Sequence, residues 1–273
     1  MNGNTSTTAK AERLSDVARL ASMWKSIDWA QAETEVNRLQ VRIAKATQEK
    51  KWNTVKRLQY LLTHSYYAKL LAVRKVTTNK GKKTPGVDKV LWNTPAQKMN
   101  AVPSLTDKGY KASPLRRVYI EKKGKKAKRP LGIPTMYDRA MQALYALALD
   151  PVSEVTADKH SFGFRKGRCC QDACEYIFAD LVRTVSPEWV LEGDIKGCFD
   201  NISHDWLIAN IPMDKSVLKQ FLKAGFVFKD ELFPTDAGTP QGGVVSPILA
   251  NMALDGMEKV LSDRFHTNRL DKV

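Results

Sequence analysis

The sequence predicts a mixed fold of the α+β kind, in which a helical front part is followed by short strands interleaved with helices. Apolar residues recur at helical spacing from residue 29 to residue 66. The stretch 115–121 alternates between apolar and charged residues, as a half-buried strand does. A third stretch, Trp189–Leu191, is apolar and leads to Asp194 and a glycine-containing turn. Strands that alternate with helices are typical of mixed architectures.

The charge is large and unevenly distributed along the chain. The 273 residues carry a net charge of +15. Residues 1–150 hold 30 basic and 11 acidic side chains, whereas residues 151–273 hold 14 basic and 18 acidic ones. A merely soluble basic protein would not need this asymmetry. A basic half beside a mildly acidic half favours a region that binds a polyanion such as nucleic acid, next to a region that binds metal ions.

Composition also bears on the cellular location. The four cysteines form no C-x-x-C pair, and no histidine pair follows them at zinc-ligand spacing, so a zinc site is not favoured. Four dispersed thiols instead favour a reducing compartment. No apolar run approaches the ~20 residues of a membrane span. Residues 1–22 are polar, lack the apolar core of a signal peptide and are expected to form a disordered tail. The sequence therefore predicts a cytoplasmic protein without a membrane segment.

The front part is predicted to contain an antiparallel pair of helices. Asp28 is a candidate N-cap, and two amphipathic stretches follow that meet near residues 48–51. Basic residues on their polar faces either form an ordinary solvated surface or face RNA, and the regional charge favours RNA. The candidate RNA-binding residues of the two helices are Arg38, Arg42, Lys45, Lys56 and Arg57. A turn-rich loop that follows adds Lys80, Lys82 and Lys83.

The middle of the chain is predicted to contain a hairpin with a basic tip. Residues 90–112 are expected to be irregular. The strand over 115–121 is followed by residues 122–129, six of which are basic around a glycine. Such a tip is either a solvated loop or a binding site for phosphates, for which arginine offers a bidentate fork and lysine a point charge. Helices are predicted over 137–149 and 171–185.

The predicted strand over 189–194 ends in Asp194, whose carboxylate it would project from a rigid sheet. Magnesium prefers carboxylate oxygens and keeps waters for substrate phosphates. One aspartate does not build a two-ion site, so a second acidic cluster is needed. Phe199, on the turn that leaves the strand, either packs under the sugar of a nucleotide or belongs to the core.

A glycine loop, Pro240–Gly243, precedes a helix expected from Ser246 to about Leu261. Glycine permits positive φ angles and close approach of a ligand. Gln241 lies in this loop, where it is placed to hydrogen-bond a base edge or a sugar. The glycine turn alone is weak evidence, but its combination with the turn after Asp194 strongly indicates nucleotidyl transfer.

These segments together resemble the reverse transcriptases that group II introns encode, the intron maturases. The segments that carry the resemblance cover nearly the whole chain from about Trp24: LAVRKVTTNKGK from Leu71, TPGVD from Thr84, PLRRVYI from Pro114, KRPLGIPT from Lys128, SFGFRKGR from Ser161, DIKGCFDNI from Asp194 and TPQGGVVSP from Thr239. The resemblance implies a right-hand polymerase fold. A helical RNA-binding N-terminal extension (23–112) would precede the fingers (113–187) and a partial palm (188–273).

The resemblance also implies roles for single residues. Asp194 would be the first aspartate that binds Mg²⁺, assisted by the carbonyl of Ile195. Phe199 would gate the sugar and Gln241 would contact the nucleotide or its template pairing. Arg129 would hold the triphosphate with either Lys122 or Lys123, since this hairpin is longer than the family's common form. The implied partners are group II intron RNA, an RNA template with a DNA primer, and a dNTP.

The departure from the family's pattern that matters most concerns the metal ligands. The Tyr/Phe-x-Asp-Asp turn that supplies the other metal ligands does not occur in these 273 residues. We therefore expect an N-terminal fragment that binds RNA but does not polymerise unaided. The alternatives are an RNA-binding splicing cofactor without polymerase activity of its own and, less favoured, a degenerate reverse transcriptase with a host role. An incomplete palm sheet would expose an edge, so a homodimer is also expected.

Overall fold

The computed structural model describes residues 4–122, 124–186 and 188–265 and shows a mixed α+β fold. The predicted antiparallel helix pair is confirmed. Its first helix begins at Asp28, whose carboxylate accepts a hydrogen bond from the backbone N–H of Gln31 at 3.0 Å. The helices of the front part are α1 (Asn4–Lys25), α2 (Trp29–Gln48), α3 (Trp52–His64), α4 (Tyr66–Thr78) and α5 (Pro95–Ser104), with a 3₁₀ turn η1 (Lys80–Lys83) before α5.

Three helices of the front part, α1, α4 and α5, were not predicted. The structure has the helix α1 where a disordered tail was expected over residues 1–22. Its C-terminal end packs against the core through Leu20 and Trp24, and the Trp24 ring lies 5.1 Å from that of Trp29. Helix α5 lies in the stretch expected to be irregular. Its signal was present in the sequence, because Thr94 and Gln97 form a capping box and a proline follows the cap.

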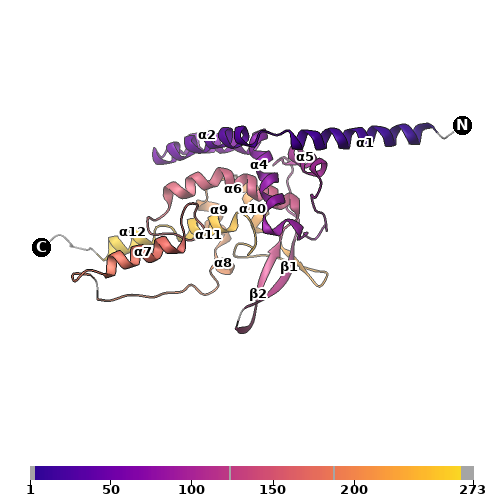
Figure 1. Cartoon of the computed structure of the whole chain (residues 1–273). Coiled ribbons are helices and arrows are strands. Elements are labelled where there is room, and N and C mark those ends of the chain that lie inside the picture. The colour runs from indigo at the N-terminus through magenta and orange to yellow at the C-terminus, as the bar shows by residue number, and fades with distance from the viewer. Residues whose placement is uncertain (1–3, 123, 187, 266–273) are drawn as a thin grey trace.

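The long helix α6 (Met136–Thr156) is the centre of the molecule and is buried on nearly all sides. In Figure 1 it lies directly beneath α2, and it also contacts α3 and α4. Pro151 has no N–H to donate to the carbonyl of Leu147 one turn earlier. The side chain of Gln40 on α2 donates to that carbonyl instead, at 2.7 Å. The interruption in the central helix therefore serves as a docking point for α2.

A four-stranded sheet with the order β2-β1-β3-β4 lies at one end of the molecule. The predicted basic hairpin is formed by β1 (Leu115–Lys122) and β2 (Lys125–Ile133), which pair antiparallel. Figure 1 shows this hairpin protruding from the body. The short strands β3 (Phe226–Phe228) and β4 (Glu231–Phe233) form a second hairpin, and β3 runs parallel to β1.

The back part consists of short helices around the lower side of α6. The helix predicted from Ser246 to Leu261 is interrupted at Gly256, which has φ = +98° and starts a second helix. The helices are α7 (Cys170–Leu181), α8 (Cys198–Asn201), α9 (His204–Asn210), α10 (Lys215–Leu222), α11 (Ser246–Leu254) and α12 (Met257–Arg264). In the part of the chain that the structure describes, no helix has the length and apolar character that a membrane crossing requires.

The buried strand predicted over residues 189–194 is not formed. Figure 1 shows the segment between α7 and α8 as an extended stretch along the edge of the molecule. Trp189 is 92% exposed and Leu191 is 96% exposed. A strand is stable only when neighbours pair with its backbone. In the described residues, the four strands of the sheet pair with one another and none lies beside this segment.

Candidate functional site

The turn after Asp194 is a compact, internally bonded unit. Gly197 has φ = +62° and caps the short helix α8. Its carbonyl accepts hydrogen bonds from the backbone N–H groups of Asp200, at 2.9 Å, and Asn201, at 3.1 Å. The side chain of Asn201 donates to the carbonyl of Lys196 at 3.1 Å. The turn is therefore shaped by its own residues, although no strand leads into it.

Three short hydrogen bonds join this turn to the glycine loop some forty residues later in the chain. The backbone N–H of Thr239 donates to the carbonyl of Phe199, and that of Gly238 donates to the carbonyl of Ile202, both at 2.7 Å. The buried His204 donates from Nε2 to the carbonyl of Gly238 at 2.7 Å. These contacts place the two sequence motifs in one site.

The glycine loop is also tied to the hairpin and to the central helix. The backbone N–H of Gly132, at the end of β2, donates to the carbonyl of Gln241 at 2.9 Å. The side chain of Gln142 on α6 accepts a hydrogen bond from the N–H of Val244 at 2.7 Å. Ser246, which was predicted to cap the following helix, instead donates from Oγ to the carbonyl of Pro240 at 2.9 Å. The position of Gln241 is thus set by elements from three parts of the chain.

A cavity of about 180 Å³ lies where these elements meet. Phe199 and Gln241 both line it, and the amide of Gln241 lies 3.4 Å from the carboxylate oxygens of Asp200. The ring of Phe199 is half-buried and meets Phe164 edge to face. Two lining groups, Nε of Arg117 and Oγ1 of Thr239, are buried and have no hydrogen-bond partner among the described residues. Buried polar groups left unpaired are costly, so these atoms favour a polar ligand in the cavity.

Asp194 and Ile195 lie beside this cavity in sequence but do not line it. Both residues are exposed, on the extended segment that leads into the turn. Together they offer one carboxylate and one backbone carbonyl, which are the kinds of oxygen that Mg²⁺ prefers. Within the described ranges, no three His, Cys, Asp or Glu side chains are grouped so that they could hold a metal ion. The residues thus fit part of a magnesium site, and a two-ion arrangement needs further carboxylates.

Of the predicted triphosphate-binding residues, Arg129 does not line the cavity. Arg129 is exposed on β2, opposite Ile120 of β1. Lys123 and the side chain of Lys122 lie outside the described part of the structure. The hairpin contributes Arg117 to the cavity instead, and its guanidinium carbon lies 3.8 Å from the centre of the Phe226 ring. Sequence reasoning missed Arg117, because alternation in the strand shows that it and Arg116 face opposite sides but not which side meets the glycine loop.

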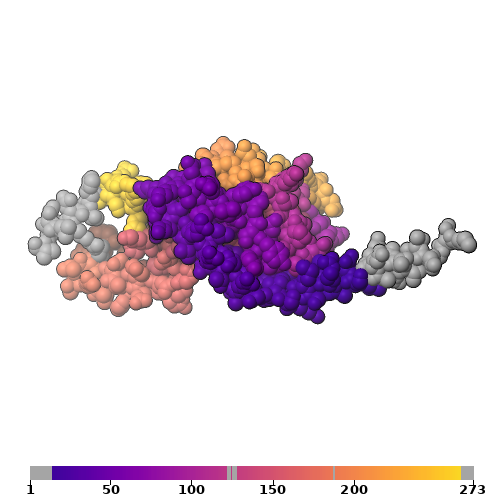
Figure 2. Space-filling model, turned by 90° about the horizontal axis from the view of Figure 1, so that it is seen from above, coloured from indigo at the N-terminus to yellow at the C-terminus, as the bar shows by residue number. Residues whose placement is uncertain are grey.

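The predicted RNA-binding residues are exposed basic side chains of α2, α3 and η1, together called the basic surface of the front part. Figure 2 shows the face that the front helices cover. Of these residues, Arg38 forms an ion pair with Glu35, in which the guanidinium nitrogen lies 3.2 Å from the carboxylate oxygen. All eight side chains are exposed: Arg38, Arg42, Lys45, Lys56, Arg57, Lys80, Lys82 and Lys83.

The basic turn η1 is anchored by a buried arginine that the sequence did not single out. Arg139 on α6 donates to the carbonyls of Gly81 and Pro134, each at 3.0 Å, and to that of Thr84. Burial lowers the pKa of the Arg139 guanidinium from its ordinary value. Arg139 lies among apolar residues in the helical pattern of α6. That position was the signal for a buried charge that needs hydrogen-bond partners.

Comparison with known proteins gives the following matches. Residues 120–271 match the family model described as reverse transcriptase (RNA-dependent DNA polymerase), and residues 24–105 match the N-terminal domain of reverse transcriptase. The group II intron-encoded protein LtrA of Lactococcus lactis subsp. cremoris is 38% identical over 227 residues, which is 80% of this chain and 37% of LtrA. An uncharacterized 91 kDa protein in the cob intron of Schizosaccharomyces pombe is 32% identical over 71% of this chain and 24% of its own length.

A solved structure, described as a partial Cas6-RT-Cas1–Cas2 complex, matches 76% of this chain and 35% of the solved chain, with 25% identity and a TM-score of 0.47. The present chain spans little more than a third of the length of LtrA.

Proposed function

This chain belongs to the reverse transcriptases, the RNA-dependent DNA polymerases, and on that premise we propose that it is the N-terminal polymerase region of a group II intron maturase. It binds intron RNA to promote splicing. As part of a form with a complete palm, it catalyses Mg²⁺-dependent, RNA-templated DNA synthesis for intron mobility. The likeness to an intron-encoded protein supports the RNA partner. In this division, residues 23–112 are the RNA-binding extension, 113–187 the fingers and 188–273 part of the palm.

The observation that carries the proposal is the cavity shared by Phe199 and Gln241. Two motifs far apart in the chain meet there through backbone hydrogen bonds, and the cavity wall holds unpaired polar atoms. A dNTP fits this chemistry. Phe199 would pack against its sugar, Gln241 would hydrogen-bond the nucleotide or its template partner, and Arg129 with Lys122 or Lys123 would reach its phosphates from the hairpin.

Asp194 and the carbonyl of Ile195 would hold Mg²⁺ at the mouth of this site. The ion would supply charge stabilisation for phosphoryl transfer once further carboxylates join it. What the described residues contribute is placement. The turn that follows Asp194 is bonded to residues 238 and 239 through the carbonyls of Phe199 and Ile202, so Asp194 would precede the nucleotide contacts by only a few residues. RNA template and DNA primer would run past this edge toward the hairpin.

RNA binding is expected to depend on the basic surface of the front part. Changing Arg38, Arg42 and Lys56 together to glutamate should weaken the affinity for intron RNA and flatten its salt dependence. Each phosphate contact to a single strand adds about 0.7 to the slope of log K against log salt, so the loss of three contacts lowers the slope by about 2. Fluorescence anisotropy of a labelled intron RNA over a salt series measures both quantities.

The matched control reverses three exposed lysines of the back part, Lys159, Lys223 and Lys229. It changes the net charge by the same amount but leaves the front surface intact. The two triple variants should therefore differ in affinity and in slope. Equal losses in both would show that net charge alone attracts RNA, and the front surface would no longer be a defined binding site.

The isolated 273-residue polypeptide is proposed to be inactive as a polymerase, because in the described structure Asp194 belongs to no group of three His, Cys, Asp or Glu side chains that could hold a metal ion. The same observation favours the second candidate function, an RNA-binding splicing module without synthesis of its own.

The exposed apolar segment at Trp189–Leu191 is the surface through which two copies would associate into a homodimer. A cytoplasmic location is proposed, since all four cysteines are free thiols.

A further inference from the structure

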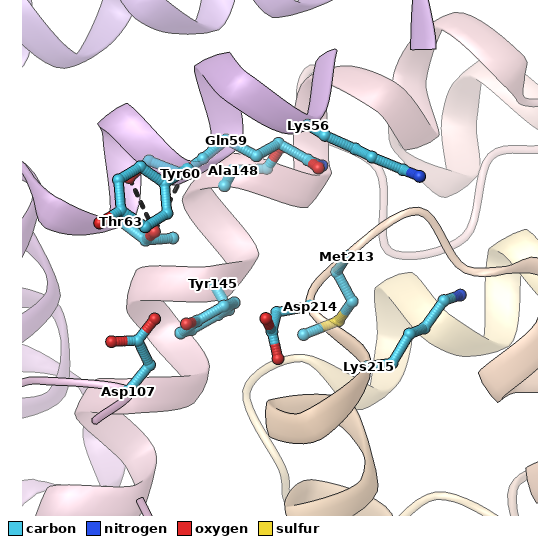
Figure 3. Close-up of a pocket in the computed structure, with 10 residues that line it drawn as sticks. All are labelled: Lys56, Gln59, Tyr60, Thr63, Asp107, Tyr145, Ala148, Met213, Asp214 and Lys215. Atoms are coloured by element: carbon cyan, nitrogen blue, oxygen red, sulfur yellow. Dashed lines mark hydrogen bonds between the residues drawn. The ribbon is translucent and has the colours of Figure 1, made fainter. Parts of the chain in front are cut away.

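A second cavity, of about 320 Å³, lies on the other side of α6 and shares no residue with the one at Phe199. It opens between α3, α6, the loop after α5 and the start of α10. The volume falls at the lower end of the ~300–1,000 Å³ that small-molecule sites occupy. The lining residues that matter here are Lys56, Tyr60, Asp107, Tyr145, Asp214 and Lys215 (Figure 3).

One wall of this cavity is an aromatic ring that is already part of a stack. Tyr60 lies on the imidazole of His64, with ring centres 3.9 Å apart and planes inclined by 27°. Its side chain nevertheless remains 60% exposed. Unpaired RNA bases bind proteins by stacking on such aromatic rings. Tyr60 therefore offers a platform on which a base would extend the existing stack.

The floor of the cavity is acidic and rich in hydrogen-bond acceptors. Figure 3 shows Tyr145 between Asp107 and Asp214. Burial raises the pKa of the Tyr145 phenol above its ordinary value, and these two carboxylates raise it further. Asp214 is engaged at the start of α10, where it accepts from the backbone of Val217 at 2.9 Å. Asp107 meets Nε2 of His64 at 3.5 Å, a longer contact. Asp107 is thus the acceptor best placed to receive N–H donors from a ligand.

The opposite side of the opening is basic. Figure 3 shows Lys56 and Lys215 extending to one side, with Tyr60 and Asp107 on the other. Burial lowers the pKa of Lys215, and the positive charge of Lys56 lowers it further. Both lysines line the cavity, and the Lys215 ammonium is held on this side by donating to the carbonyl of Ile211 at 2.6 Å. A phosphate at this side would meet two positive charges.

We infer that this cavity takes up one unpaired guanosine nucleotide of a bound RNA strand. The base stacks on Tyr60, its N1–H and N2–H groups donate to Asp107, and its phosphate lies between Lys56 and Lys215. Adenine has no such pair of donors on the corresponding edge, so a carboxylate selects guanine. This inference rests on the proposed RNA binding and adds base selection to it, at a place separate from the polymerase site.

The test compares oligouridine RNAs that carry a single central guanosine, adenosine or inosine, by fluorescence anisotropy at one salt concentration. The guanosine RNA should bind about tenfold more tightly than the adenosine RNA, with inosine between them because it lacks the N2 donors. Asp107→Asn should reduce this preference to about one. Glu231→Gln, which changes the same charge away from the cavity, should leave it intact.

Tyr60 gives a second, independent readout. Tyr60→Ala should weaken binding of both the guanosine and the adenosine RNA about tenfold, since stacking does not distinguish bases, whereas Tyr60→Phe should keep the affinity. Circular dichroism confirms that each variant folds.

The possible failures are distinguishable. If no RNA binds the wild-type chain, the proposed function fails. If the three oligonucleotides bind equally well, or Asp107→Asn leaves the preference unchanged, only the cavity assignment is overturned. Guanosine monophosphate that binds as tightly as the guanosine RNA would also overturn it, because the strand would then contribute nothing.

Discussion

Replacing Asp194 by alanine is expected to lower RNA-templated DNA synthesis by at least about a thousandfold in a form of the protein with a complete palm. A metal ion contributes several kcal/mol of charge stabilisation to phosphoryl transfer, and each 1.36 kcal/mol is about a factor of ten in rate. The RNA affinity should stay within about a factor of two, because Asp194 is an exposed acidic residue outside the basic surface. Primer extension with Mg²⁺ measures the first effect and anisotropy the second.

The control for this prediction lies two residues away. Glu192 is also exposed on the extended segment, and Glu192→Ala removes a carboxylate without touching the proposed ligand. It should keep nearly full synthesis. Synthesis by Asp194→Ala at the wild-type rate, or equal losses in both variants, would show that Asp194 does not bind the catalytic ion.

Replacing Gly238 by alanine should lower the free energy of unfolding by about 3 kcal/mol, because two unfavourable terms add. Gly238 has φ = +82°, a conformation that costs residues with a Cβ about 1–2 kcal/mol. A Cβ there would also lie 2.5 Å from the carbonyl oxygen of Phe199, and backbone would have to move. For a chain of this size the loss corresponds to a melting temperature lower by about 6–12 °C.

Thermal unfolding followed by circular dichroism measures this loss. Gly163→Ala is the matched control, since a Cβ there meets no atom within 4 Å and Gly163 is not among the glycines with positive φ. It should leave the melting temperature almost unchanged. A Gly238→Ala variant as stable as the Gly163→Ala variant would mean that the two motifs are not joined as closely as the structure shows.

The elements with local signals could be predicted from the sequence. The helix pair α2–α3, the basic hairpin and the helix cap at Asp28 depend on residues a few positions apart, and the structure confirms them. The strand before Asp194 could not be predicted correctly, because an apolar run becomes a strand only if another strand pairs with it. A single Gly256 was enough to divide the last predicted helix in two.

The candidate site could be predicted in part. The motifs around Asp194 and Gln241 were visible in the sequence, but the bonds that bring them together were not. His204 and Arg117 take part in the site through contacts with residues more than thirty positions away. Such contacts depend on how the chain folds back on itself, which no local pattern reveals. The cavity at Tyr60 has the same origin, since its walls come from four separate stretches of the chain.

The central claim is that the turn after Asp194, the glycine loop and the base of the hairpin form one nucleotide site. Photocrosslinking tests it most directly: 4-thiothymidine triphosphate is irradiated with this chain, a primer–template duplex and Mg²⁺, and the labelled peptides are identified by mass spectrometry. Labelling is expected on peptides from 115–132, 194–202 or 235–243, and excess unlabelled dTTP should abolish it. The claim would be contradicted if labelling occurred only in other parts of the chain and excess dTTP abolished that labelling.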